Sequence, residues 1–252
     1  MKALTFELSG KTAFFKKPDV NSYAYFTYGH VHKIALMGLL GAIIGLGGYN
    51  QQSRTGESEE CIYPEFYKKL KDMKISIVPL SSERKGYFSK KIQVFNNSVG
   101  YASKEDGGNL IVREQWLENP AWKIFILEDG AIDRELYDKL SYYMLNNKCV
   151  YMPYLGKNDH PADIKNISIA ELEPLGDEKH IDSLFSLKRA SLGDFPTDYL
   201  AQYMFREVAP VSLNPQYNFY EYDEICLTNL AVNNIQLIAD IYVYDKLALS
   251  FF

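Results

Sequence analysis

The chain has 252 residues, of which 47% are hydrophobic and 23% are charged, and its formal net charge at pH 7 is −5. This composition excludes a disordered chain, which would have fewer apolar residues and a larger charge imbalance, and the length suits one large domain or two small ones. The negative net charge argues against a free nucleic-acid binder held by bulk electrostatics. Any RNA must therefore bind a local basic surface or a groove shared with partner proteins.

The N-terminal residues predict a strand followed by a loop. Leu4, Phe6 and Leu8 alternate with small or polar residues, which predicts a half-buried strand over residues 2–8. Residues 9–30 are polar and rich in aromatic side chains, so we expect an irregular loop there.

An uncharged apolar stretch at residues 34–46 predicts a helix that starts near His32 and ends at the glycine pair at residues 47–48. Its 13 residues fall short of the roughly 20 that a bilayer-spanning helix needs, so we expect a buried helix and no membrane contact. The glycines from Gly38 to Gly45 are spaced three and four positions apart, hence on one helical face. We expect this face to pack closely on a sheet.

The middle of the chain predicts more strands and a second helix. Apolar residues at helical spacing predict that helix over residues 131–146, and a polar turn at residues 104–109 predicts a hairpin or an extended loop. Further strands are expected at residues 74–80, 110–116, 122–127 and 149–152. The resulting order is β-α-β-β-α-β, which is the ferredoxin-like fold that includes RNA-recognition domains.

The C-terminal part is rich in predicted strands. These lie at residues 166–175, 203–213, 217–227 and 237–244. The expected architecture is therefore α+β, with a ferredoxin-like RNA-binding domain over residues 1–155 and a smaller β-rich unit over residues 156–252.

The number and spacing of the cysteines indicate whether disulfides or a zinc site are expected. Cys61, Cys149 and Cys226 are far apart and odd in number, so neither a zinc site nor a disulfide framework is expected. We expect buried, reduced thiols in a cytoplasmic protein that needs no metal and no other cofactor.

Four parts of the sequence together resemble one protein family. They are residues 4–16 (LTFELSGKTAFFK) leading into residues 32–45 (HKIALMGLLGAIIG), residues 113–125 (REQWLENPAWKIF), residues 154–163 (YLGKNDHPAD) and residues 208–213 (VAPVSL). Together they are similar to the Cas-five family of CRISPR-associated proteins, in the form found in type I-B systems. Residues 28–33 depart from the family, in which two prolines and a hydroxyl residue often precede the helix. Only the location of this loop near RNA therefore carries over.

The resemblance implies a subunit of Cascade, the RNA-guided surveillance complex of antiviral defence. Such subunits cap the 5′ end of the CRISPR RNA and hold its repeat-derived handle, and a thumb hairpin, here expected around residues 81–112, packs beside the backbone subunits. The implied partners are CRISPR RNA, the Cascade backbone subunits and the large subunit, with target DNA reached only through the complex. Type I-B systems normally use a separate endonuclease, so we expect no catalysis, although a type I-C branch of the family cuts the precursor itself.

Basic and aromatic side chains near the expected RNA are the candidate contacts. Residues 84–91 hold four basic residues and two rings in eight positions, a combination that suits phosphates and unstacked bases. The full set is Lys16, Lys17, His30, His32, Lys33, Arg84, Lys85, Tyr87, Lys90, Lys91, Arg113 and Lys157. We expect the basic members to meet phosphates and Tyr87 to stack on a base.

Two alternatives stay open. The first is a metal-independent endoribonuclease that processes repeat RNA, with His30 or His32 as general base and Lys33 steadying a charged transition state. A pair of ordinary surface histidines is the more common arrangement. The second is a purely structural wedge between protein subunits, which would also fit the acidic net charge.

Overall fold

The computed structural model defines the fold for most of the chain. It describes residues 1–19, 23–51, 63–81, 86–96, 98–101, 104–106, 108–193 and 202–252. The expected RNA contacts Arg84 and Lys85 lie outside the described residues, as does Cys61.

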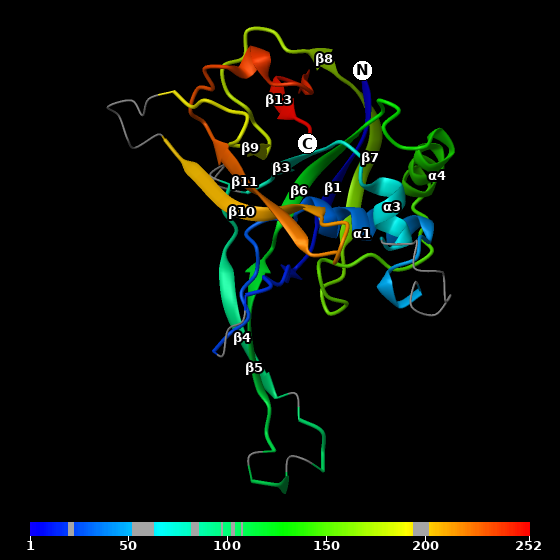
Figure 1. The fold of residues 1–252 in the computed structure, drawn as a ribbon, viewed down its shortest axis with the longest axis vertical. Helices are drawn as coiled ribbons and strands as arrows, with labels where there is room; N and C mark the ends of the chain where they lie inside the picture. The colour runs from blue at the N-terminus through cyan, green and yellow to red at the C-terminus, as the bar shows by residue number, and fades with distance from the viewer. Residues whose placement is uncertain are drawn as a thin grey trace.

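A four-stranded sheet carries the ferredoxin-like fold (Figure 1). Its elements in chain order are β1 (Lys2–Ser9), α1 (Lys33–Ile44), β3 (Ile75–Pro79), β6 (Ala121–Leu127), α4 (Arg134–Leu145) and β7 (Asp163–Glu171). The strands lie in the order β3-β6-β1-β7, and every neighbouring pair is antiparallel. The two crossover helices and this strand order confirm the β-α-β-β-α-β fold.

The last strand of this sheet is not where the sequence placed it. Residues 149–152 were expected to form it, but they form no strand; the backbone N–H groups of Val150 and Tyr151 donate to carbonyls of Ile43 and Ala42 at 2.8 and 3.1 Å. The segment thus satisfies carbonyls in the last turn of α1, of which the Ala42 carbonyl also accepts from the N–H of the capping residue Gly45 at 3.3 Å. The true strand, β7, lies beyond the expected boundary at residue 155 and pairs with β1, while the division into two folding units stays a prediction.

Helix α1 confirms the predicted buried helix, with two differences. It ends at Gly45, which has a φ of +81°, and not at the following glycine pair. Its glycine face is not turned to the sheet as expected: Gly41 packs against Phe66 of α3 (Glu65–Leu70), and Gly38 borders open space. No helix in the described part of the chain is long and apolar enough to cross a bilayer.

We expect Gly41→Leu to destabilise the protein by about 1–3 kcal/mol or more, because it overpacks a filled site. A Cβ at Gly41 would lie 2.8 Å from the Cβ of Phe66, an atom that cannot swing away as the end of a long side chain can. Urea unfolding measures the loss. Gly38→Ala is the matched control: its Cβ would lie 3.9 Å from Phe66, and alanine in a helix should stabilise by roughly 0.5–1 kcal/mol. A Gly41→Leu protein that unfolds like the parent would contradict this packing.

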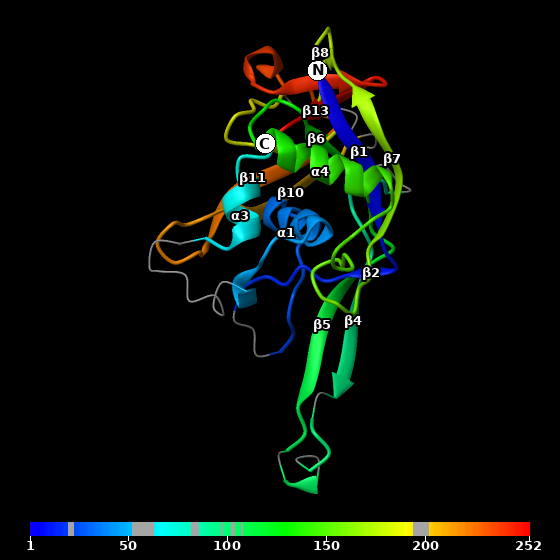
Figure 2. The ribbon, with the colours of Figure 1, turned by 90° about the vertical axis from the view of Figure 1, so that its right-hand side faces the viewer.

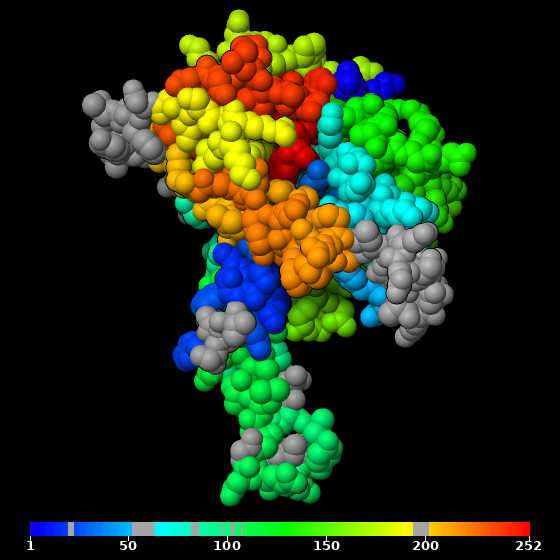
Figure 3. Space-filling model, viewed as in Figure 1, coloured from blue at the N-terminus to red at the C-terminus, as the bar shows by residue number. Residues whose placement is uncertain are grey.

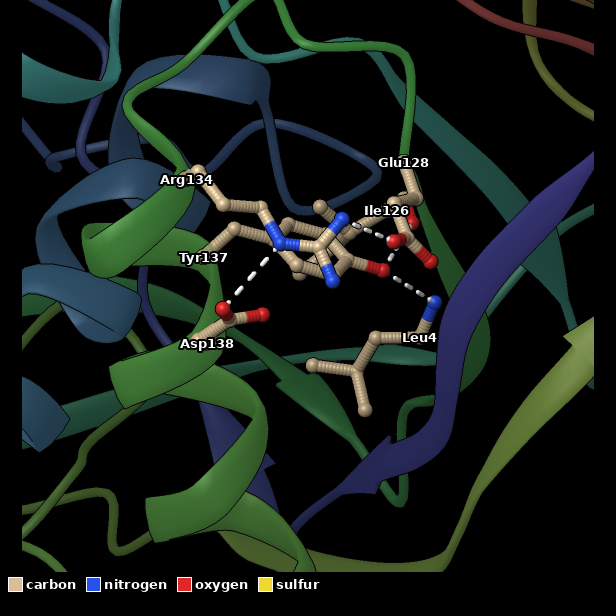
Figure 4. A network of polar contacts seen from close by, with 6 residues as sticks. All are labelled: Leu4, Ile126, Glu128, Arg134, Tyr137 and Asp138. Carbon is tan, nitrogen blue, oxygen red and sulfur yellow. Dashed lines mark hydrogen bonds and ion pairs between the residues drawn. The ribbon is translucent and has the colours of Figure 1, made fainter.

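Helix α4 is fixed to the sheet by polar contacts at its first turns (Figure 4). The hydroxyl of Tyr137 accepts a hydrogen bond from the backbone N–H of Leu4 at 3.1 Å, and burial raises the pKa of Tyr137 to about 12. Arg134 forms ion pairs with Glu128, just after β6, and with Asp138, one turn along the helix. The contacts with Leu4 and Glu128 join α4 to the sheet, whereas the pair of Arg134 with Asp138 lies within the helix.

A long hairpin projects from the sheet (Figures 1 and 2). Its arms are β4 (Lys90–Asn96) and β5 (Ile111–Glu118), and β2 (Thr12–Ala13) adds a short strand at its base. The strand expected at residues 110–116 is therefore an arm of this hairpin and not part of the four-stranded sheet. The arms extend past residue 112, where the sequence placed the end of the thumb.

The C-terminal part, whose residues run from yellow-green to red in Figure 3, forms two small sheets. Their strands are β8 (Glu173–Pro174), β9 (Phe185–Ser186), β10 (Met204–Leu213), β11 (Tyr220–Thr228), β12 (Ile241–Tyr244) and β13 (Leu247–Ser250), with a 3-10 turn at Ile235–Leu237. Leu249 and Phe251 are buried against Phe125 and Leu127 of β6. Because neighbouring residues of a strand point to opposite faces, these residues cover the face of the sheet opposite the two helices.

Candidate nucleic-acid interface

A cleft of about 1030 Å³ runs along the small-residue face of α1. It is lined by Phe14, Phe15, Lys16, Tyr25, His32, Ala35, Gly38, Leu39, Ala42, Leu46, Gly48, Tyr49, Asn50, Gln51, Phe66, Glu114, Tyr151, Tyr154, Gly156, Lys157 and Tyr220. The glycine and alanine positions of α1 therefore leave room here, where the sequence suggested close packing on a sheet. Three of the expected contact residues, Lys16, His32 and Lys157, meet in this cleft.

Cations lie close to aromatic rings in the cleft. The ammonium of Lys16 lies 3.9 Å from the ring centroid of Tyr25, and that of Lys157 lies 5.9 Å from the ring centroid of Phe14. Tyr25 is held beside the hairpin, because its backbone N–H donates to the carbonyl of Arg113 at 2.9 Å. Ammonium groups bind phosphates and exposed rings stack on bases, so the cleft offers both kinds of contact that single-stranded RNA uses.

The loop that carries Lys157 depends on a glycine. Gly156 has a φ of +88°, and a Cβ there would lie 2.0 Å from the carbonyl oxygen of Phe14. The N–H of Phe14 in turn donates to the carbonyl of Leu155 at 3.1 Å. Only glycine permits this approach, which places Lys157 and Tyr154 at the cleft.

A buried carboxylate that was not among the expected contact residues lies at the base of the hairpin. Glu114 is 6% exposed and lines the cleft. It accepts hydrogen bonds from the ammonium of Lys157 at 3.1 and 3.2 Å and from the indole N–H of Trp116 at 2.8 Å. Glu114 sits within an ordinary strand pattern, so nothing local marks it as part of a site.

His30 is a core residue, so the expectation of a surface histidine is wrong. It is 4% exposed, and its Nδ1 accepts a hydrogen bond from the indole N–H of Trp122 at 3.1 Å. Because an indole can only donate, the proton of the neutral ring lies on Nε2, which donates to the carbonyl of Gly86 at 2.8 Å. Burial lowers the pKa of His30 from 6.5 to about 3.

His32 is also buried, at 7% exposure, and it caps α1. Its Nδ1 accepts a hydrogen bond from the N–H of Ala35 at 3.3 Å, and burial lowers the pKa of His32 from 6.5 to about 3. Lys33 follows His32 in the chain, and burial lowers the pKa of Lys33 to about 8. The three residues of the proposed ribonuclease site line one second pocket beside β10, but its volume of about 20 Å³ has room for about one water molecule and not for a nucleotide.

The other expected contacts lie around the hairpin and outside the cleft. Lys17 forms an ion pair with Glu207 at 2.9 Å, and Lys91 forms one with Glu118 at 3.6 Å. The guanidinium of Arg113 lies 5.0 Å from the ring centroid of Tyr23, and burial lowers the pKa of Lys90. The ring of Tyr87 is exposed, but its hydroxyl donates to the carbonyl of Met204 at 2.8 Å. Their contacts with RNA stay predictions.

One face of the four-stranded sheet is covered by the C-terminal residues. RNA-recognition domains stack bases on the open face of their sheet, but here Leu249 and Phe251 cover that face.

No group of three or more His, Cys, Asp or Glu side chains that could hold a metal ion occurs within the described ranges. Cys149 is exposed and Cys226 is buried, so the expected burial of thiols is wrong for Cys149.

Comparisons with known proteins support the fold. No protein-family model and no curated protein sequence matches the chain. A chain of a solved structure described as a CRISPR RNA-guided surveillance complex is 11% identical with a TM-score of 0.53, and the match covers 92% of both chains. A CRISPR protein from Archaeoglobus fulgidus is 10% identical with a TM-score of 0.45, covering 99% of this chain and 98% of that chain. A chain of a type III-B Cmr-beta complex bound to cognate target RNA is 12% identical with a TM-score of 0.48, covering 92% and 86%. The first match indicates a shared fold over nearly the whole chain, and the lower scores add no argument.

Proposed function

We propose that this chain is a non-catalytic subunit of a type I CRISPR surveillance complex of the Cascade kind and that it binds the 5′ handle of the CRISPR RNA in the cleft beside α1. The observation that carries the proposal is the cleft itself. It is lined by Lys16 and Lys157 together with several aromatic rings. The fold around it is shared with a chain of a CRISPR RNA-guided surveillance complex. The type I-B form, with antiviral defence in the cytoplasm as its setting, rests on the sequence resemblance alone.

The hairpin supplies a surface for the backbone subunits. Three apolar residues, each about half exposed, lie on one face of the hairpin: Ile92, Val94 and Ile111. Ile92 and Val94 are alternate residues of β4, and Ile111 pairs with Asn96, the next residue on that face. Exposed apolar residues in a row on a projecting arm favour contact with another protein. The large subunit completes the partners of this chain, and target DNA reaches it through the complex.

The histidines support a binding role. A general base needs a ring nitrogen that can take a proton near neutral pH. Both ring nitrogens of His30 form hydrogen bonds within the core, and Nδ1 of His32 accepts the hydrogen bond that caps α1. With the pKa of each lowered to about 3, neither suits proton transfer at pH 7.

We expect the purified chain to bind labelled repeat RNA and leave it intact. The RNA should migrate as a shifted, full-length species in the presence of a metal chelator. His32→Asn is the informative variant, because asparagine keeps an N-cap acceptor but has no ionisable ring. Specific cleavage that disappears in His32→Asn or His30→Ala would establish the endoribonuclease instead, and RNA that is neither bound nor cut would contradict both.

A further inference from the structure

A patch of large apolar side chains is exposed where α1 and α4 end. Met152 is 76% exposed, and the other members are each about half exposed. The helix-end patch consists of Tyr142, Leu145, Val150, Tyr151 and Met152. Single exposed apolar residues are normal on a protein surface, but a group of them marks a place where another molecule binds.

Hydrogen bonds fold residues 142–152 onto the ends of both helices. The chain reverses after α4, where the backbone N–H of Lys148 donates to the carbonyl of Tyr143 at 2.8 Å. The side chain of Val150 then packs on the end of α1, because a Cβ at Gly45 would lie 3.0 Å from Cγ2 of Val150. The helix-end patch therefore rests on two fixed helices, which limits the conformational entropy that is lost when a partner binds.

The helix-end patch is flanked by positive charge. Residues 139–158 contain three lysines and no acid, although the chain as a whole carries a net charge of −5. The ammonium of Lys148 donates to the hydroxyl of Tyr142 at 2.8 Å. That of Lys139 donates to the carbonyl of Ile44 at 2.9 Å. Both acceptors are neutral, so these hydrogen bonds do not compensate the charges of the lysines. A complementary surface has an apolar centre with carboxylates around it.

A protein fits this surface better than RNA or a second copy of the chain. Leu145, Val150 and Met152 have no ring to stack on a base and no group to bind a phosphate. Tyrosine and methionine, by contrast, are enriched in protein–protein interfaces. Two copies of the chain that met at the patch would bring the same lysines together, and like charges oppose such a contact.

We propose that the helix-end patch docks a second protein, one that presents apolar side chains flanked by carboxylates. The partner is another subunit of the complex in which the chain works, which rests on the proposed function. This contact is distinct from that of the hairpin. It is also distinct from the RNA cleft, because Tyr151 alone among the five members of the patch lines that cleft.

Two chemical probes test the proposal on the free chain and on the complex purified after coexpression with the other subunits and RNA. Cys149 is exposed beside the patch, so iodoacetamide should alkylate it in the free chain. Mass spectrometry of its peptide should show protection of Cys149 in the complex. A zero-length carbodiimide should join Lys139 or Lys148 to Asp or Glu residues of another subunit.

Met152→Asp should lower the yield of that crosslinked subunit, relative to this chain, by about tenfold or more, because it places a carboxylate among apolar groups and facing like charges. Leu237→Asp is the matched control. Leu237 is 85% exposed and lies outside the patch, so the same substitution there should leave assembly at the parent level. Both variants should melt like the parent, because both side chains are exposed.

A Cys149 that reacts as fast in the complex as in the free chain, or a Met152→Asp chain that assembles like the parent, would overturn this docking surface and leave the proposed function standing. Ultraviolet crosslinks of RNA to Tyr142, or carbodiimide crosslinks between two copies of the chain, would assign the patch to those occupants and overturn it as well. A chain that copurifies with neither the other subunits nor RNA would overturn the docking surface and the proposed function together.

Discussion

Lowering the pH from 7.5 to 5.0 should destabilise this protein by about 4 kcal/mol or more, with about 2 kcal/mol from each of the buried residues His30 and His32. Burial lowers the pKa of His30 and of His32 from 6.5 to about 3. Below pH 6.5 the unfolded chain therefore binds a proton at each of these two residues that the folded chain does not bind. His160 is also buried, and burial lowers its pKa, so it adds to the loss in the same direction. The stability is fully present above the unfolded pKa and is lost as the pH falls from about 6.5 toward 3.

Urea unfolding at steps between pH 7.5 and 5.0 measures this slope. The window is chosen because carboxyl groups with pKa values near 4 stay ionised over most of it. His32→Asn is the control, since it keeps a cap for α1 and removes one titrating ring, so the pH-dependent loss should decrease by about 2 kcal/mol. A free energy of unfolding that is flat over this range, or one with the same slope in His32→Asn, would show that these rings are not held neutral in the core.

Replacing Lys16 and Lys157 together by Gln should weaken RNA binding by roughly tenfold to a hundredfold at low salt. Each is a cation at the cleft, and each phosphate contact on single-stranded RNA contributes about 0.7 to the slope of log affinity against log salt. The double variant should therefore flatten that slope by about 1.4. Fluorescence anisotropy with labelled repeat RNA from low to physiological salt gives both quantities.

Lys2 and Lys179 supply the matched control for that experiment. Both are exposed, neither lines the cleft, and their replacement by Gln changes the net charge of the chain by the same amount. The control variant should keep the parent slope to within a few tenths. Equal loss of affinity in both double variants would mean that RNA binding depends only on the net charge of the protein. That result would contradict RNA binding in the cleft.

The elements of the fold could be predicted where local pattern decides them. The alternation at residues 2–8 and the apolar run of α1 gave β1 and α1 within two residues. The fourth strand could not be placed from the sequence, because a strand forms by pairing with another strand and the local residue pattern does not show which segment pairs with β1. Residues 149–152 are apolar but exposed, whereas β7, with its mixed pattern of exposed and half-buried residues, is the one that pairs with β1.

The site was harder to predict because its decisive contacts join residues far apart in the chain. His30 is buried by Trp122, 92 residues away, and by Gly86, 56 residues away, so its neighbours in sequence could not reveal a core histidine. Lys16 and Lys157 were expected contacts, and both line one cleft. Their proximity depends on Gly156, whose backbone packs against the carbonyl of Phe14. Glu114 was missed since no local signal separates a cleft carboxylate from one on a strand surface.

Crosslinking within the assembled complex tests the central claim most directly. The chain is coexpressed with the other subunits and CRISPR RNA, the purified complex is irradiated, and the crosslinked peptides and nucleotides are identified by mass spectrometry. We predict crosslinks from the 5′ handle to the exposed rings of the cleft, Tyr25 and Tyr154 first among them. A complex that carries full-length RNA while the cleft peptides stay free of crosslinks would contradict the assignment of this cleft to the handle.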